Sequence, residues 1–346
     1  MKISFKNDYA EGAHPMILEA LMRTNAVQQA GYGNDSYSAA AKELIKNKIE
    51  NPEAQIFFVS GGTQANILVI GTLLRNYQSV IAPETGHIAD NETGAIEAVG
   101  HKIHLAPATN GKITPESIAD FATRYTNYPH QVQPRLVYIT NATEIGTIYT
   151  LAELKAIYEC CQAHNLLLFM DGARLGSALN AEDSDIQWKD LARYTDVFYI
   201  GATKNGGLLG EAIVINNPAL TDGFEYYLKQ QGALLAKGRL LGLQFLTLFE
   251  NGLYDALALH ANKQMKRIKE AFVANGYTLL SDTCTNQLFP ILTHTQIAAL
   301  AEQFDFYQWQ KVDETHSAIR LISSWATTDA QVDTLIQAIQ LLSVAK

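Results

Sequence analysis

The sequence predicts an α/β protein, with a large domain built on a mainly parallel sheet and a small C-terminal α+β domain. Between residues 56 and 215, short apolar runs alternate with amphipathic stretches, as in a parallel sheet covered by helices on both faces. Several runs are continuously apolar, which is expected of strands buried on both faces. After about residue 222, long helical stretches precede the remaining strands. We expect the large domain at residues 1–250, including an N-terminal arm, and the small domain at residues 251–346.

Seven strands and well-marked helix starts are expected in the large domain. Thr150 and Glu153 form the pattern of a capping box at the start of one helix. Thr114 and Pro115 mark another start, because proline fits the first helical position. The expected strands are Ile56–Val59, Val80–Ala82, Ile103–Ala106, Leu136–Thr140, Leu166–Asp171, Val197–Ile200 and Glu211–Ile215.

The C-terminal part is expected to be mainly helical. A helical region runs from Tyr226 to Asn275, with breaks at Gly232 and Gly252, and Thr328 would cap the last helix. The strands expected between these helices are Tyr277–Leu280, Leu288–Leu292 and Ile319–Ser323.

The composition argues against several classes of function. A net charge of -9 lacks the basic surface that nucleic acid requires. No stretch approaches the roughly 18 apolar residues of a membrane span, and the N-terminus lacks the apolar core of an export signal. The 3 cysteines form neither a disulfide framework nor a metal-ligand spacing, so we expect a cytoplasmic protein without a metal. The low charged fraction of 18% leaves room for buried subunit contacts, and a homo-oligomer is expected.

An apolar strand that begins at Val197 leads to Lys204, which small residues surround. A lysine in such a turn can point inward without crowding. Burial weakens its affinity for a proton, so that it could form a Schiff base with a cofactor such as pyridoxal phosphate (PLP). The alternative is a surface lysine in a glycine-rich turn.

A second apolar strand, Leu166–Asp171, ends in a carboxylate. An acid there could pair with the pyridine nitrogen of PLP and keep it protonated, which makes the ring an electron sink. A helix cap or a metal ligand is the alternative. Asp171 and Lys204 would both emerge at the carboxyl edge of the sheet, where α/β proteins bind ligands.

Two further segments could complete a cofactor site. Ser60, Gly61, Gly62 and Thr63 lie between a strand and a helix, where free backbone N–H groups and hydroxyls could bind phosphate. Many strand-to-helix turns share this composition, however. His87 follows the next strand and could stack on a planar ring or exchange protons near neutral pH. A lone histidine is more often merely exposed or hydrogen-bonded, so the combination is more specific than any one part.

In this order, the four segments resemble the threonine aldolase and β-eliminating lyase family of PLP enzymes. That family has the aspartate aminotransferase fold, known as fold type I. The likeness covers almost the whole chain. It includes Phe5–Asp8, Gly31–Asp35, Gly62–Asn66, His87, Asn141–Tyr149, Met170–Arg174, Gly201–Gly206, Ile319–Leu321 and Ser324–Thr328.

The resemblance implies which residues hold the cofactor. Lys204 would form the Schiff base, Asp171 would pair with the pyridinium, and His87 would stack on the ring. Gly62 and Thr63, with their neighbours in the turn, would hold the phosphate.

The resemblance also implies how the substrate and the subunits are arranged. Arg174 and Arg320 would bind the substrate carboxylate, because a guanidinium fork suits two oxygens. Asn7, where the family often has serine, is assigned to the substrate site, and Arg174 also lies beside the cofactor. Lys237 and Arg239 would reach a cofactor phosphate across the boundary of a dimer or tetramer. The alternative for these two is a solvated helix face.

The activity implied is aldol cleavage of β-hydroxy-α-amino acids, such as L-threonine or L-allo-threonine, to glycine and an aldehyde. It would pass through an external aldimine and a quinonoid carbanion. The β-hydroxyl must lose a proton, and His87 is the candidate base, with Glu144 or Glu92 as alternatives. Glu144 stands where many members have a histidine, which leaves the base and the preferred substrate open. A β-eliminating lyase, an aminotransferase or a catalytically silent PLP-binding protein are the other possibilities.

Overall fold

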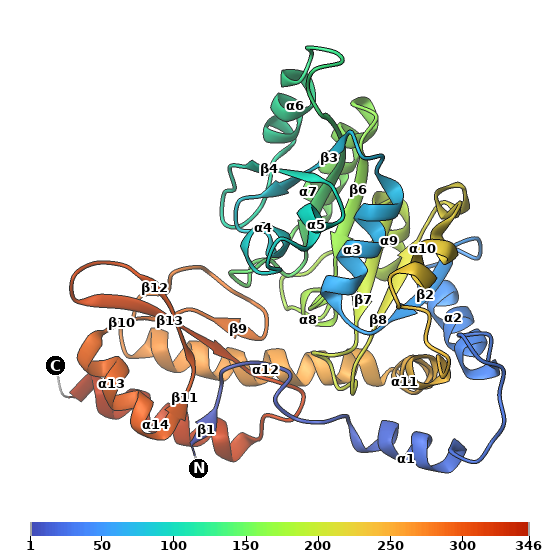
Figure 1. The fold of residues 1–346 in the computed structure, drawn as a ribbon. Coiled ribbons are helices and arrows are strands. Elements are labelled where there is room, and N and C mark those ends of the chain that lie inside the picture. The colour runs from blue at the N-terminus through green and yellow to red at the C-terminus, as the bar shows by residue number, and fades with distance from the viewer. Residues whose placement is uncertain (1, 345–346) are drawn as a thin grey trace.

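The computed structural model describes residues 2–344 and has the expected large sheet (Figure 1). The strand order is β2-β8-β7-β6-β5-β3-β4. All neighbouring pairs from β4 to β7 are parallel, whereas β8 is antiparallel to both β7 and β2. The strands are β2 (Gln55–Val59), β3 (Gln78–Pro83), β4 (Lys102–Ala106), β5 (Gln133–Thr140), β6 (Leu167–Asp171), β7 (Val197–Gly201) and β8 (Glu211–Ile215). The prediction of a mainly parallel sheet is confirmed.

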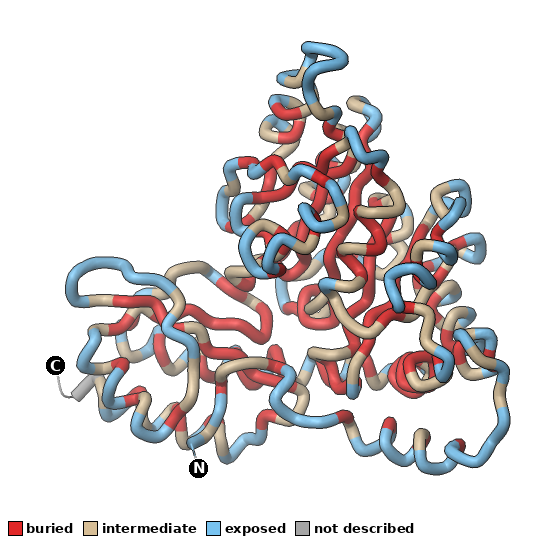
Figure 2. Tube along the Cα trace, in the orientation of Figure 1, coloured by how far each residue is buried: buried red, intermediate tan, exposed pale blue. Residues whose placement is uncertain are grey.

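Helices cover both faces of this sheet, and the strands between them are buried (Figures 1 and 2). Successive residues of a strand point to opposite faces, so Phe198 packs in one apolar cluster and Tyr199 in the other. One cluster receives α3 (Gly62–Leu73), α4 (His87–Asp90), α5 (Ala95–Ala98) and α10 (Phe224–Gln230). The other receives α1 (Pro15–Thr24), α2 (Ser36–Lys48), α6 (Pro115–Arg124), α7 (Leu151–Ala163), α8 (Leu175–Leu179), α9 (Trp188–Tyr194) and α11 (Arg239–Glu250).

The predicted helix starts are confirmed by their hydrogen bonds. Thr150 and Glu153 form a reciprocal capping box at the start of α7. Thr114 caps α6, with Pro115 at its first position. Thr328 accepts from the backbone N–H of Gln331 in the first turn of the last helix.

The small domain packs a second, antiparallel sheet against helices. The strands of this sheet are β9 (Gln287–Leu288), β10 (Ile291–Thr293), β12 (Tyr307–Lys311) and β13 (His316–Ile322), and β11 (Phe304–Asp305) lies outside it. Its helices are α12 (Leu253–Ala274), α13 (His294–Gln303) and α14 (Asp329–Val344), and a short 3-10 turn, η1 (Pro218–Thr221), lies earlier in the chain. The sheet order is β10-β13-β12, and β9 pairs with the far end of β13. The predicted helical region is interrupted at Gly232 and Gly252, as expected. Both glycines have a left-handed backbone conformation, with a φ of 69°.

Two strand predictions for the small domain are wrong in detail. Tyr277–Leu280 is not a strand, and only Leu279 forms an isolated bridge, to Pro290. The expected strand Leu288–Leu292 is divided into β9 and β10 at the same proline. Proline has no N–H group and cannot continue a ladder, which accounts for both differences.

The first residues of the N-terminal arm pack with the small domain. β1 (Ile3–Ser4) pairs in parallel with β11, and Phe5 is buried in the apolar cluster of the small domain. The chain then crosses to the large domain, as the blue segment of Figure 1 shows. α11 ends at Glu250, directly before α12, and we propose the boundary between the domains at residues 250 and 251. No helix of residues 2–344 has the length and apolar character of a membrane span.

Candidate active site

The candidate residues meet at the carboxyl edge of the large sheet. Asp171 ends β6, Lys204 follows β7, and His87 follows β3 by a short turn. These strands are parallel, so their carboxyl ends share one edge. β2 also runs in this direction, because both β2 and β7 are antiparallel to β8, and it brings Ser60 to the same edge.

Asp171 is held by donors from three neighbouring elements. It is buried, and its Oδ2 accepts from Tyr138 Oη at 2.6 Å and from Asn66 Nδ2 at 3.3 Å. Its Oδ1 accepts from the hydroxyl of Tyr199 and from the backbone N–H of Ala173 at 3.0 Å. Burial and the nearby carboxylate raise the pKa of both tyrosines well above the ordinary value, so both hydroxyls remain donors. Four donors hold the carboxylate in a fixed position.

A hydrogen-bonded chain connects this carboxylate to His87. Asn66 also donates to Glu92 Oε1 at 2.7 Å, and the same oxygen lies 2.8 Å from His87 Nδ1. Burial alone would lower the pKa of His87, but the hydrogen bond with Glu92 and the charges of Glu144 and Asp171 outweigh this effect and raise it. Glu92, which was an alternative base, is thus placed as the partner of His87.

Lys204 lies in the connection between β7 and β8. Burial and the charge of Arg174 lower its pKa, whereas Asp8, Glu144 and Asp171 act in the opposite direction. A lowered pKa favours the neutral amine, which is the form that attacks an aldehyde.

The turn at residues 60–63 leaves the start of α3 free of side-chain caps. Gly61 is the N-cap residue and makes no side-chain hydrogen bond. The backbone N–H and the hydroxyl of Ser60 both donate to Gln64 Oε1, at 3.0 Å and 2.9 Å. A Cβ atom at Gly62 would lie 2.9 Å from Tyr199 Oη, so glycine is required for this approach. Thr63 is exposed in the first turn. An uncapped helix start with free N–H groups suits an anionic phosphate.

Arg174 forms a buried ion pair that the sequence did not predict. Its Nε and Nη2 donate to Asp8 at 2.7 Å and 3.1 Å. Asn286 Nδ2 also donates to Asp8, at 2.9 Å. These three residues and Lys204 line one small cavity. The N-terminal arm and the small domain therefore jointly orient Arg174.

Arg320 lies on β13 with its guanidinium group over two aromatic rings. The ring centroids of Tyr307 and Trp309 are 4.9 Å and 4.7 Å away. Its Nε is buried without a hydrogen-bond partner among residues 2–344. Burial and the charge of Arg174 lower its pKa, while Glu144 and Asp8 oppose this. Two neighbouring guanidinium groups, one with an unsatisfied donor, suit a carboxylate ligand.

The remaining candidates differ in how well the structure places them. Glu144 is half-buried and its charge acts on His87, Arg174 and Arg320, so it faces the site. Asn7 lies beside Asp8, and its side chain accepts from the backbone N–H of Tyr9 at 3.1 Å.

The two basic residues at the start of α11, Lys237 and Arg239, do not join the site within one chain. Arg239 donates to the backbone carbonyls of Thr24 and Val27, and its guanidinium group lies over the ring of Tyr37. Lys237 is exposed. Neither residue lines the small cavity beside Lys204.

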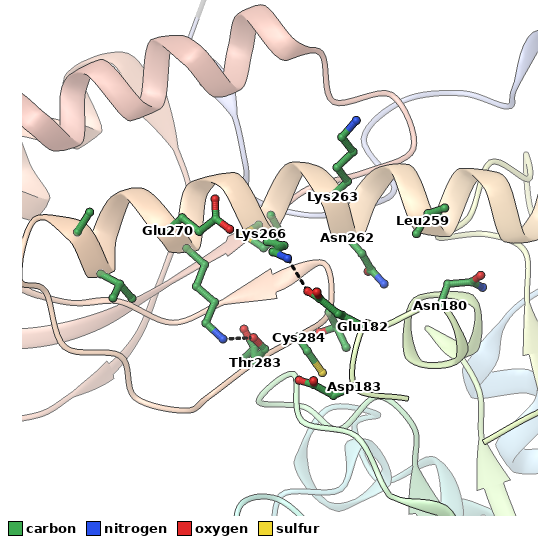
Figure 3. A pocket seen from close by; sticks show the side chains of 15 residues that line it. Asn180, Glu182, Asp183, Leu259, Asn262, Lys263, Lys266, Glu270, Thr283 and Cys284 are labelled. Carbon is green, nitrogen blue, oxygen red and sulfur yellow. Dashed lines mark hydrogen bonds and ion pairs between the residues drawn. The ribbon is translucent and has the colours of Figure 1, made fainter. Parts of the chain in front are cut away.

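A larger cavity, shown in Figure 3, is lined by a different set of residues. It has a volume of about 770 Å³ and is formed by α12 with the segments around Glu182 and Cys284. Lys266 pairs with Glu182 at 2.6 Å across it, and Lys269 donates to the Thr283 carbonyl at 2.7 Å. None of the predicted site residues lines this cavity, so size alone does not identify the active site.

The comparison with known proteins agrees with the site geometry. The sequence profile described as beta-eliminating lyase matches residues 7–295. The chain belongs to the beta-eliminating lyase family. The low specificity L-threonine aldolase of Pseudomonas aeruginosa is 35% identical, over 98% of this chain and 97% of its own. The enzyme of the same name from a Pseudomonas species is 34% identical, over 95% and 94%.

Comparison with solved structures also finds proteins with the same fold. A structure described as Leishmania major threonine aldolase is 45% identical and has a TM-score of 0.96, covering 99% of both chains. Sphingomonas wittichii serine palmitoyltransferase is 16% identical with a TM-score of 0.74, covering 99% of this chain and 88% of its own, and shares the fold. The fold-type-I prediction is confirmed.

Members of this family use PLP, and the residues present fit it. The uncapped start of α3 suits the phosphate, and the oriented carboxylate of Asp171 suits a protonated ring nitrogen. Lys204 has the lowered pKa that imine formation requires. The cofactor prediction made from the sequence is therefore supported by three independent features of the site.

Sequence reasoning missed several residues that the structure brings to this site. Asp8 and Asn66 lie within the segments that resemble the family, but they were given no role. Tyr138 and Tyr199 lie in apolar strands, where a buried hydroxyl needs a hydrogen-bond partner. This requirement could have indicated that both tyrosines bond a polar group of the site. Asn286 had no signal in the sequence.

Asp8→Asn is expected to destabilise the protein and weaken substrate binding. The variant leaves Arg174 without its buried counter-charge, which costs about 3 kcal/mol of unfolding free energy, and KM should rise at least about tenfold. Asp305→Asn is the matched control, because it breaks the exposed pair with Lys6 in the same arm and costs less than about 1 kcal/mol. Chemical denaturation and steady-state kinetics measure both effects. Equal destabilisation in the two variants would contradict the orienting role of Asp8.

Proposed function

We propose that this protein is a PLP-dependent aldehyde lyase that cleaves β-hydroxy-α-amino acids to glycine and an aldehyde. L-threonine and L-allo-threonine, which yield acetaldehyde, are the proposed substrates. The observation that carries the proposal is that Lys204 and Arg174 line one cavity, with the charge of Asp171 acting on Lys204 and Arg320 close enough to Arg174 for their charges to interact. Similarity to threonine aldolases along nearly the full chain supports it.

Each residue of the site has one task in this proposal. When bound, the cofactor ring withdraws electrons from the α-carbon of the amino acid. Lys204 holds the cofactor covalently, and Asp171 keeps a proton on its ring nitrogen. The turn at residues 60–63 binds the phosphate through N–H groups and hydroxyls. Arg174 and Arg320 bind the substrate carboxylate, which fixes the orientation of the bond to be broken.

His87 is the proposed acceptor for the proton of the substrate β-hydroxyl. Its Nδ1 faces the carboxylate of Glu92, which leaves Nε2 as the free acceptor and stabilises the imidazolium form. His87 would also lie against the cofactor ring. Glu144 remains the alternative acceptor, because its charge acts on His87 and on both arginines of the site.

Glu92→Gln is expected to shift the pH dependence of cleavage. The base must be neutral to accept a proton, so kcat/KM should rise as pH increases through the pKa of His87, which Glu92 helps to raise. Without the carboxylate this pKa falls, and the acidic limb should move to lower pH by about one unit. The exposed Glu97→Gln serves as the control. If the acidic limb of the kcat/KM profile does not move, another group accepts the proton, and Glu144 is the first candidate.

Product analysis distinguishes the possible reactions of this site. A panel of L-threonine, L-allo-threonine, serine and phenylserine should yield glycine and the matching aldehyde. Pyruvate and ammonia would instead indicate β-elimination, and an amino group transferred to a keto acid would indicate an aminotransferase. A protein that binds PLP but converts none of these substrates would contradict an enzymatic role.

We propose a cytoplasmic homo-oligomer, a dimer or a tetramer, in which Lys237 and Arg239 act on the cofactor phosphate of a neighbouring subunit. The cysteines Cys160, Cys161 and Cys284 are unpaired, which supports a reducing compartment. Mixing Lys204→Ala with Arg239→Ala subunits tests the sharing of sites. Activity above that of either parent supports it, whereas parental activity after proven subunit exchange excludes it.

A further inference from the structure

The side chain of Arg320 is turned away from the core of the small domain. Its neighbours on β13, Ile319 and Leu321, are both buried in the apolar cluster of that domain. Successive residues of a strand point to opposite faces, so Arg320 points to the face that this cluster does not fill. The charges of Arg174 and Asp8 act on its guanidinium group, which places the group near the candidate active site.

Two aromatic side chains of β12 hold this guanidinium group. Tyr307 is the cross-strand partner of Arg320. The register of the two strands shifts between Gln308 and Gln310, so Trp309 lies at a bulge and has no partner opposite it. The guanidinium carbon of Arg320 is 4.9 Å from the ring centroid of Tyr307 and 4.7 Å from that of Trp309. Both rings are thus within the range of a cation–π contact.

Burial of apolar surface alone does not account for this pair of rings. β12 is the edge strand of the small-domain sheet (Figure 1). Tyr307 is 38% exposed and Trp309 is half-buried. The fully buried Phe289 packs against Trp309 in a T-shaped contact, with 5.3 Å between the ring centroids, and fixes the indole in place. The rings therefore remain partly open to solvent while they cover Arg320.

The two arginines of the site are held in different ways. Arg174 donates from Nε and Nη2 to Asp8, so part of its hydrogen-bonding capacity is already used. An aromatic ring contacts the flat face of a guanidinium group and leaves the N–H donors in its plane free. The Nε of Arg320 is buried and has no hydrogen-bond partner within residues 2–344. Arg320 therefore keeps donors available for a ligand.

We propose that Tyr307 and Trp309 position Arg320 for the substrate carboxylate, and that they thereby give the site its preference for ligands that carry a carboxylate. The rings restrict the guanidinium group before the ligand arrives, so that less conformational entropy is lost on binding. An acidic residue could also fix the arginine, but it would compete with the substrate for the same donors. The inference rests on the proposed function, because it takes Arg320 as a carboxylate-binding residue.

The test compares the binding of glycine and glycinamide to the PLP-loaded protein by calorimetry. Both ligands have the same amino group, but glycinamide lacks the carboxylate. The ratio of the two dissociation constants measures the preference for a carboxylate, and comparing this ratio between variants cancels other differences between the ligands. Tyr307→Leu and Trp309→Leu should each weaken glycine binding by about threefold to tenfold and leave glycinamide binding nearly unchanged.

Conservative variants and a double-mutant cycle separate positioning from a structural role. Tyr307→Phe and Trp309→Phe keep a ring and should retain most of the preference for glycine. In an Arg320→Ala background, which lacks the proposed binding group, Trp309→Leu should have no further effect on the ratio. Gln310→Leu changes an exposed residue of the same strand and is the matched control, which should equal the wild type.

Each outcome decides between the inference and its alternatives. A wild-type preference that survives in both leucine variants would overturn the inference and leave the proposed function intact. Equal losses for glycine and glycinamide would indicate a general structural effect and would also overturn it. If the wild type shows no more preference for glycine than Arg320→Ala does, Arg320 does not bind the carboxylate. That result would refute the substrate site of the proposed function together with the inference.

Discussion

Replacing Lys204 by alanine is expected to abolish covalent cofactor attachment and to lower kcat by at least about 1000-fold. Lys204 is the residue whose lowered pKa and position after β7 suit imine formation. The purified wild type should be yellow, and borohydride should fix the cofactor to the chain. The variant should lose both the absorption band and the reducible linkage.

The control for this variant is Lys155→Ala, which removes an exposed lysine from α7. It should keep the colour, the linkage and the activity of the wild type. A borohydride-reducible linkage that survives in Lys204→Ala would show that another amine holds the cofactor. Peptide mapping of the reduced wild-type protein would then identify that amine.

Replacing Asp171 by alanine is expected to lower kcat by about 100-fold to 1000-fold while some cofactor binding remains. The phosphate turn and Lys204 are unchanged, so attachment does not depend on this carboxylate alone. The ring nitrogen loses its anionic partner, and the ring becomes a poorer electron sink. Tyr138 and Tyr199 also lose the acceptor for their buried hydroxyls, which adds a cost in stability.

Asp196→Ala separates the catalytic effect from the structural one. Asp196 accepts from the backbone N–H of Leu168 at 2.7 Å and precedes β7, at the edge of the sheet opposite to the site. Its loss should lower Tm and leave turnover of the folded protein nearly unchanged. For each variant, comparing kcat with the fraction of protein that carries cofactor separates a loss of catalysis from a loss of cofactor binding. Near-normal turnover in Asp171→Ala would refute the role of the pyridinium partner.

Fold type could be predicted because its signals are local. A capping threonine such as Thr150 acts within one helical turn, and an apolar strand such as Val197–Gly201 is apparent from consecutive residues. The small domain was harder to predict, because its strands are short. β12 (Tyr307–Lys311) is mostly exposed and polar, so its pattern does not differ from that of a loop.

The sequence by itself determined the parallel sheet, its order of strands and helices along the chain, and the edge at which Lys204 and Asp171 emerge. Strand direction follows from the alternation of strands and helices, so residues at the carboxyl ends of such strands must meet. The resemblance of short segments to a known family also indicated Arg174 and Arg320 as site residues.

Only the tertiary structure decided which groups surround these residues. Asp8 and Arg174 are 166 residues apart in the chain, and Asn286 and Asp8 are 278 apart. No periodicity extends over such distances, because hydrophobic patterns report which face of an element is buried but not what lies against it. The partner of a buried charge is set by how whole elements pack.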